Sequence, residues 1–102
     1  ARATKIRRAG AAGNRMRHDT DRQLRQILTD VLGLKKGQAE AFDADTGLFG
    51  HLPELDSMAV AGLLTEIEDK LGFHIDDDEI DGDILETYGA LLAFAEAKRK
   101  AA

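Results

Sequence analysis

The chain is 102 residues long, with 43% hydrophobic and 32% charged residues. That length supports one small hydrophobic core and not two, which argues against a two-domain enzyme. No apolar run approaches the roughly 20 residues that cross a bilayer, so we expect a soluble protein with no membrane insertion. The sequence contains no cysteine, which excludes disulfides, thiolate metal ligands and cysteine nucleophiles.

Charge is divided unevenly along the chain, whose formal net charge is −5. Residues 1–17 carry six basic side chains and no acidic one, so the remaining chain has a net charge of −11. Such a field repels nucleic acid and attracts basic protein surfaces. We interpret residues 1–17 as a disordered basic extension, namely a linker, a transit-peptide remnant or a cloning scar, and residues 18–102 as the folded domain.

In chain order, the first predicted element is a helix over residues 20–32. Its apolar residues recur at helical spacing, Thr20 and Gln23 have the pattern of a capping box, and Gly33 supplies a stop. Residues 34–55 show no periodic stretch longer than a turn, which predicts a long loop. Five apolar side chains would anchor that loop to a core: Phe42, Leu48, Phe49, Leu52 and Leu55.

A second helix is predicted to begin directly after Asp56, a favoured N-cap residue, with Ser57 as its first residue and Gly72 as its stop. One side of this helix is apolar and would face the core: Val60, Leu63, Leu64, Ile67 and Leu71. The opposite side would be free for a partner: Met58, Ala61, Gly62, Thr65, Glu68 and Asp69.

The last third of the chain predicts a minor helix and a main one. An acidic stretch over residues 76–83 leads into Ile80, Ile84 and Leu85, whose spacing fits one or two helical turns. Thr87 can cap a final helix with Tyr88, Leu91, Leu92 and Ala95 on one face. No segment alternates with period two, so the predicted fold is all-α: a small four-helix bundle of three main helices and one short helix, with a long loop between helices one and two.

Ser57 is the residue with the clearest chemical setting. It stands where unpaired backbone N–H groups and the positive end of a helix dipole gather, which suits a phosphate group. It lacks the Gly-x-Ser-x-Gly turn of hydrolytic serines, and no histidine or lysine lies near it in sequence to act as a base. We therefore expect no catalytic residue here, and the chemistry would be done to Ser57 by another protein.

The sequence resembles the acyl carrier protein family over about residues 20–98. The resemblance rests on LPELDSM at residues 52–58, on EIEDKLG at residues 66–72, and on LETY at residues 85–88. It implies that a separate transferase modifies Ser57 with 4′-phosphopantetheine, using coenzyme A and magnesium. The thiol of that arm would then carry an acyl group as a thioester, in fatty-acid, polyketide or related specialised biosynthesis.

The resemblance also implies partner contacts and a setting. Asp56 would help to dock the phosphopantetheinyl transferase, and Met58 would supply an apolar contact beside it. Acyl-loading and acyl-processing enzymes with basic docking patches would recognise the same helix face, at Ala61, Thr65, Glu68 and Asp69. The expected protein is a cytoplasmic, monomeric carrier and not an enzyme.

Two departures from the family pattern are informative. Fatty-acid carriers usually have Asp directly after the motif and Glu in the middle of the helix, where this sequence has Ala59 and Gly62. The missing charges argue against recognition by ordinary fatty-acid synthase enzymes and for a specialised carrier. The chain is similar to carriers associated with bacterial exosortase and exopolysaccharide systems, and a polyketide-synthase carrier with residues 1–15 as linker is an alternative.

Two other function classes are open from the residues alone. The exposed side of the second helix suits a helical interaction module with no prosthetic group. The acidic turn imitates the start of a calcium-binding loop, but Tyr88 falls where a bidentate glutamate is needed. We therefore predict no dedicated metal site and at most weak binding of divalent cations. His51 is either a solvated loop residue or a contact for the arm or a partner.

Overall fold

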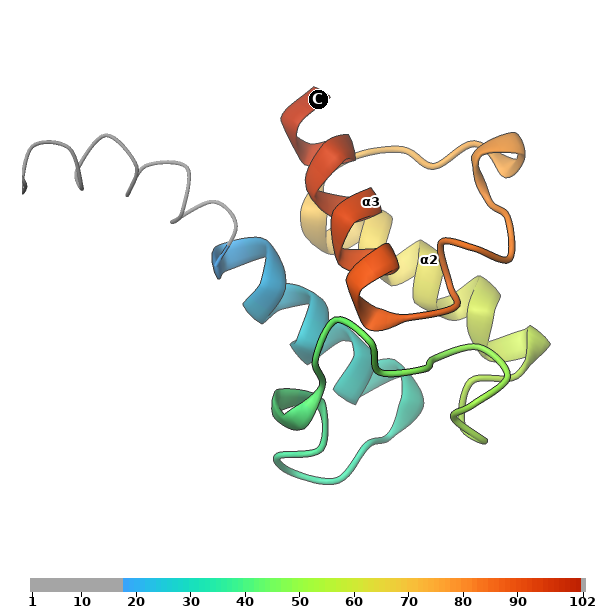
Figure 1. Cartoon of the computed structure of the whole chain (residues 1–102). Helices are drawn as coiled ribbons and strands as arrows, with labels where there is room; N and C mark the ends of the chain where they lie inside the picture. Colours follow the sequence, from blue (N-terminus) through green and yellow to red (C-terminus); the bar gives the residue numbers. More distant parts are fainter. Residues whose placement is uncertain (1–17, 102) are drawn as a thin grey trace, which may run out of the picture.

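The computed structural model describes residues 18–101, and the predicted basic extension lies outside them. Within that range the secondary structure is helical, without strands, and a single isolated bridge joins Gly47 to Thr87. The all-α prediction is confirmed. The main helices are residues 18–32, α2 (Ser57–Leu71) and α3 (Tyr88–Ala101), which Figure 1 shows packed around one another.

The ends of α2 and the start of α3 are where the sequence predicts them. The Asp56 carboxylate accepts a hydrogen bond from the Ala59 N–H at 2.8 Å, and Gly72 ends α2 in the left-handed conformation with φ 77°. Glycine is favoured there because it lacks the Cβ that strains other residues at positive φ. Thr87 Oγ1 accepts from the Ala90 N–H at 3.1 Å, as expected of a cap.

The predicted capping box at the first helix is wrong. Residues 18 and 19 are already helical, so Thr20 lies inside the helix, where it is fully buried. Its hydroxyl accepts a hydrogen bond from Arg99 on α3 at 2.9 Å, and Gln23 donates to Asp19 at 2.7 Å. A tertiary contact with α3 therefore uses the side chain that the local pattern assigned to the helix end.

The predicted minor helix is shorter than expected and lies earlier in the chain. It is a single 3-10 turn, η2 (Asp77–Glu79), closed by reciprocal hydrogen bonds between Asp76 and Glu79. Ile80 returns to an extended conformation with φ −91° and ψ 118°. The three apolar residues after the turn pack against the core from a loop: Ile80, Ile84 and Leu85. A second 3-10 turn, η1 (Ala39–Ala41), interrupts the long loop.

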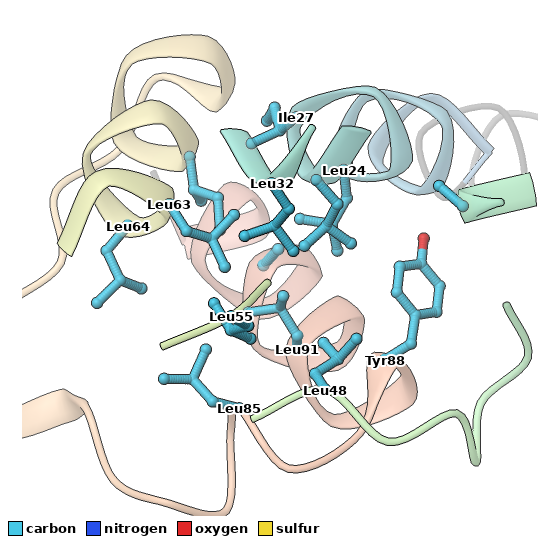
Figure 2. Close-up of a cluster of buried hydrophobic side chains, with 14 of the residues drawn as sticks. Leu24, Ile27, Leu32, Leu48, Leu55, Leu63, Leu64, Leu85, Tyr88 and Leu91 are labelled. Atoms are coloured by element: carbon cyan, nitrogen blue, oxygen red, sulfur yellow. The ribbon is translucent and has the colours of Figure 1, made fainter. Parts of the chain in front are cut away.

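The core lies where the three main helices meet the long loop. Figure 2 shows Leu24, Leu63 and Leu91 pointing toward one another from the first helix, α2 and α3. All three are completely buried, as is Leu48 from the loop. Of the predicted loop anchors, Phe42, Leu48 and Leu55 are buried, Leu52 is half-buried, and Phe49 keeps 39% of its surface exposed.

Backbone hydrogen bonds join the middle of the long loop to the start of α3. The N–H groups of Leu48 and Phe49 donate to the carbonyls of Glu86 and Leu85 at 2.8 and 2.9 Å. Gly89 donates to the Ala44 carbonyl at 3.0 Å, and a Cβ at Gly89 would lie only 2.8 Å from that oxygen. Glycine is therefore required for this close approach. These bonds fix the segment that precedes Ser57.

A polar cluster of Tyr88, Asp21 and Arg25 connects the first helix, η1 and α3. The buried Tyr88 hydroxyl donates a short hydrogen bond to the Asp21 carboxylate. Burial and the Asp21 carboxylate both raise the pKa of Tyr88, so the hydroxyl keeps its proton. The Arg25 guanidinium lies 4.5 Å from the centre of the Tyr88 ring and donates to the carbonyls of Ala39 and Phe42. The polar partner of the buried Tyr88 hydroxyl is thus Asp21.

Candidate functional site

The candidate site is the first turn of α2, with Ser57 as its first residue. Ser57 and Asp56 are both exposed, whereas the preceding Leu55 is buried at 3% exposure and fixes the entry of the chain into the helix. Asp56 receives the N–H of Ala59 on its side chain, and its carbonyl receives the N–H of Val60 at 3.0 Å. The N–H groups of Ser57 and Met58, the first two of the helix, have no hydrogen-bond acceptor among residues 18–101.

This arrangement favours an anion at Ser57. The free N–H groups at a helix start carry partial positive charge, and together with the helix dipole they stabilise a phosphate. No side chain between residues 18 and 101 hydrogen-bonds to the Ser57 hydroxyl. The oxygen therefore has room for a bulky substituent and has no neighbouring base that would make it a nucleophile in its own right.

Among the described residues, three hollows adjoin Ser57. One of about 350 Å³ is lined by Phe49, Val60, Ile80 and Leu85, together with Asp81 and Gly82. A second, of about 590 Å³, is bordered by residues 49–53 and 55–57. The third, of about 390 Å³, runs along α2 between Val60 and Glu68 and is closed by Ile75, Asp77 and Ile80. A group attached to Ser57 would start at the point where all three meet.

The predicted partner face is mostly open. Met58 is 85% exposed, and Ala61, Thr65 and Asp69 are also exposed. The structure thus brings four of the five predicted contact residues onto one accessible side of α2. At Gly62 an added Cβ would meet only Val31, at 4.0 Å. Nothing in the described part of the chain requires glycine at that position.

Glu68 differs from the rest of this face because its carboxylate is already bound within the chain. Oε2 accepts the Ile75 N–H at 2.7 Å and lies 3.1 Å from Nδ1 of His74. Nε2 of His74 lies 3.0 Å from the Asp76 carboxylate. Glu68 therefore holds the segment after α2 in place, in addition to any contact with a partner.

The acidic residues after α2 are likewise used in local structure. The Glu79 carboxylate accepts hydrogen bonds from Lys98 at 2.9 Å, and this contact lowers the pKa of Glu79. Asp81 accepts the Ile84 N–H at 3.1 Å. Within residues 18–101 no three His, Asp or Glu side chains gather as ligands for a metal ion. The same residues form no helix long and apolar enough to span a bilayer.

Two side-chain contacts near the site could not be predicted from the sequence. The His51 side chain lies against the backbone of Gly47, and a Cβ at Gly47 would be 2.4 Å from Cγ of His51. The His74 side chain connects Glu68 to Asp76. Both depend on how the loops fold back, which the spacing of residues does not reveal.

The fold and the site define a small helical protein that presents an unhindered hydroxyl at the electropositive start of a helix. A family model described as "Phosphopantetheine attachment site" matches residues 22–95. A holo acyl carrier protein from Nitrosomonas europaea, solved by solution NMR, is 42% identical with a TM-score of 0.70, over 76% of this chain and 93% of that one. No curated protein matches the chain.

The chain therefore belongs to the acyl carrier protein family, in which 4′-phosphopantetheine is covalently attached. This membership confirms the predicted family, the class of prosthetic group and the expectation of a carrier instead of an enzyme. It also indicates, in general terms, a transferase that attaches the group and enzymes that process the acyl cargo.

Proposed function

We propose that Ser57 is the residue that carries the 4′-phosphopantetheine arm. The observation behind this proposal is that Ser57 is the only serine in the sequence and is the exposed first residue of α2. The donors around it fit the phosphate end of the arm, because the N–H groups of Ser57 and Met58 are free for an anion. When attached, the arm supplies a thiol that holds an acyl group as a thioester.

The partners in this proposal are a phosphopantetheinyl transferase, which uses coenzyme A and magnesium, and enzymes that load and process the acyl group. Asp56 lies directly beside the attachment residue, where the transferase must contact the chain. The docking face would combine an apolar contact at its start with acidic side chains at its end: Met58, Ala61, Thr65, Glu68 and Asp69. Enzymes with basic patches fit such a face, because opposite charges steer their approach.

The proposed cargo is an acyl intermediate of fatty-acid, polyketide or related specialised biosynthesis. At Ala59 and Gly62 the chain lacks two charges that fatty-acid carriers usually have, which favours a specialised partner set over the ordinary fatty-acid synthase enzymes. The exposed Gly62 supports this view, because packing within the described residues does not require glycine there. A Cβ at Gly62 would meet only Val31, at an ordinary contact distance of 4.0 Å. The proposal places residues 18–102 as the carrier domain, acting as a cytoplasmic monomer.

Intact-mass measurement tests the attachment residue. The chain is incubated with coenzyme A, magnesium and a broad-specificity transferase, and we expect a gain of one phosphopantetheinyl group. Ser57→Ala should gain none, because the attacking hydroxyl is gone. Thr29→Ala is the matched control, since it removes a hydroxyl from the first helix, outside α2 and its docking face, and should still be loaded in full. An unchanged mass with several active transferases would instead favour an interaction module without a prosthetic group.

A further inference from the structure

The largest of the three described hollows beside Ser57 is on the loop side of the helix start and has no lining residue from α3 or η2. Its lining comes from the loop residues 49–53 and from Leu55, Asp56 and Ser57 itself. Figure 1 shows this part of the loop curving directly ahead of the first turn of α2. Because Ser57 is part of the wall, a group attached to its hydroxyl can enter this hollow, as it can the other two.

The exposed His51 side chain lies at this hollow, close to the backbone of the loop. The His51 ring lies against the Cα of Gly47, and a Cβ at Gly47 would be 2.4 Å from Cγ and 2.5 Å from Cδ2. Gly47 in turn is fixed by its bridge to Thr87. No hydrogen bond within residues 18–101 uses the ring nitrogens of His51. The imidazole therefore lies exposed beside the loop, and its ring nitrogens are open to a ligand.

Phe49 gives the same hollow an apolar wall. Its backbone is fixed by the hydrogen bond to Leu85, yet 39% of its surface is exposed. It also lines the smaller hollow toward Ile80 and Leu85, so it separates the two spaces next to Ser57. A rigid backbone with an exposed ring beside the attachment residue offers a surface that an apolar group can cover.

We propose that the hollow over residues 49–56 holds the pantetheine part of the arm, with Phe49 and His51 as its contact residues. This placement rests on the proposed attachment at Ser57. Pantetheine combines a geminal dimethyl group with two amides, so it needs an apolar wall and a hydrogen-bonding partner together. Phe49 and His51 supply both here. On the other side of Phe49 the lining is Val60, Ile80 and Leu85 with Gly82 and Asp81, and the Asp81 carboxylate already accepts the Ile84 N–H.

Isotope-filtered NMR tests the placement without reference to acyl transfer. A ¹³C,¹⁵N-labelled chain is loaded with an unlabelled arm from coenzyme A, and loading is verified by intact mass. We expect NOEs from the geminal methyl groups of the arm to the Phe49 ring and from the arm to the His51 ring. The amides of residues 50–55 should also shift between the unloaded and the loaded chain.

Three variants refine this test. Phe49→Ala should lose most of the NOE intensity to the loop. Gly47→Ala displaces the His51 ring by steric contact, so it should lose the His51 NOEs and keep those to Phe49. Ile80→Ala is the matched control, because Ile80 lines the other two hollows and not this one, so the variant should keep both sets of NOEs.

The possible outcomes separate the two proposals. A chain that gains no mass overturns the attachment at Ser57 and the arm placement with it. A loaded chain whose NOEs fall only on Val60, Ile80 or Leu85, or that shows none to the chain, overturns the placement alone. If Phe49→Ala loses its dispersed amide spectrum, the NOE pattern of the wild type and of Gly47→Ala decides the question.

Discussion

The start of α2 and the cluster around Tyr88 are both polar, but their side chains are used in opposite ways. At the start of α2 the Ser57 hydroxyl is exposed and has no partner within the described residues. In the cluster, the Tyr88 hydroxyl is buried and bound to Asp21, while Arg25 reaches two backbone carbonyls. The difference indicates that the fold is secured away from the site, so the site can change chemically at little cost to stability.

Removing the Tyr88 hydroxyl should have the largest effect on stability. Tyr88→Phe deletes the hydrogen bond to the Asp21 carboxylate, and a bond to a charged group contributes about 2 kcal/mol. For a domain of this size that loss lowers the Tm by roughly 10 °C. Thermal unfolding measures it, with Ser57→Ala as control, expected to stay within about 0.5 kcal/mol of the wild type. Equal losses in the two variants would contradict the contrast between the regions.

Asp56→Ala should have a smaller effect. The substitution removes the hydrogen bond to the Ala59 N–H, which costs about 1 kcal/mol for a helix cap. Urea denaturation measures this change, and Asp56→Asn, which keeps a capping oxygen, should recover most of it. These two Asp56 variants also separate stability from loading, because Asp56→Asn keeps the cap but removes the charge beside Ser57. If the transferase reads that charge, Asn should slow phosphopantetheine loading as Ala does, while restoring stability.

The smallest stability effect should come from acidification. Hydrogen bonds from Arg99 and Lys98 are the main causes that hold the pKa values of Asp19 and Glu79 below their ordinary 3.8 and 4.5. Because both values are lowered on folding, the stabilisation is present at neutral pH and is lost as the pH falls below about 4. Both carboxylates are solvent-accessible, which keeps the effect modest.

Lys98→Met tests this pH dependence. It removes the partner of Glu79, so urea denaturation at pH 7 and at pH 3.5 should show a smaller difference than in the wild type. Ser57→Ala, at the start of α2, should keep the full difference. A variant lacking Lys98 that responds to pH as the wild type does would show that the ion pair contributes nothing.

Local signals account for the parts of the fold that the sequence predicts well. The capping contacts of Asp56, Gly72 and Thr87 involve backbone groups within four residues of each. The local sequence alone therefore places the ends of α2 and the start of α3. The predicted attachment residue lies at one of these ends, and for that reason its setting could be derived before the structure. The family resemblance then supplied the chemistry that the setting alone left open.

Distant contacts explain what the sequence could not predict. Thr20 has the pattern of a cap but hydrogen-bonds to Arg99, which is 79 positions away. Ile80 and Leu85 have helical spacing, yet the reciprocal bonds of Asp76 and Glu79 close a single turn and the chain then extends. The placement of His51 over Gly47 depends on the return path of the loop. None of these three contacts can be read from the pattern of residues adjacent in the sequence.

The bridge between Gly47 and Thr87 joins residues that are 40 positions apart in the sequence. Together with the hydrogen bonds from Leu48 and Phe49 to the segment before α3, this bridge connects the long loop to the start of α3. A displacement at the start of α3 would reach the wall of the hollows beside Ser57 through peptide groups alone, with no side chain as intermediary. The position of the loop beside Ser57 is therefore tied to the start of α3 by the backbone itself.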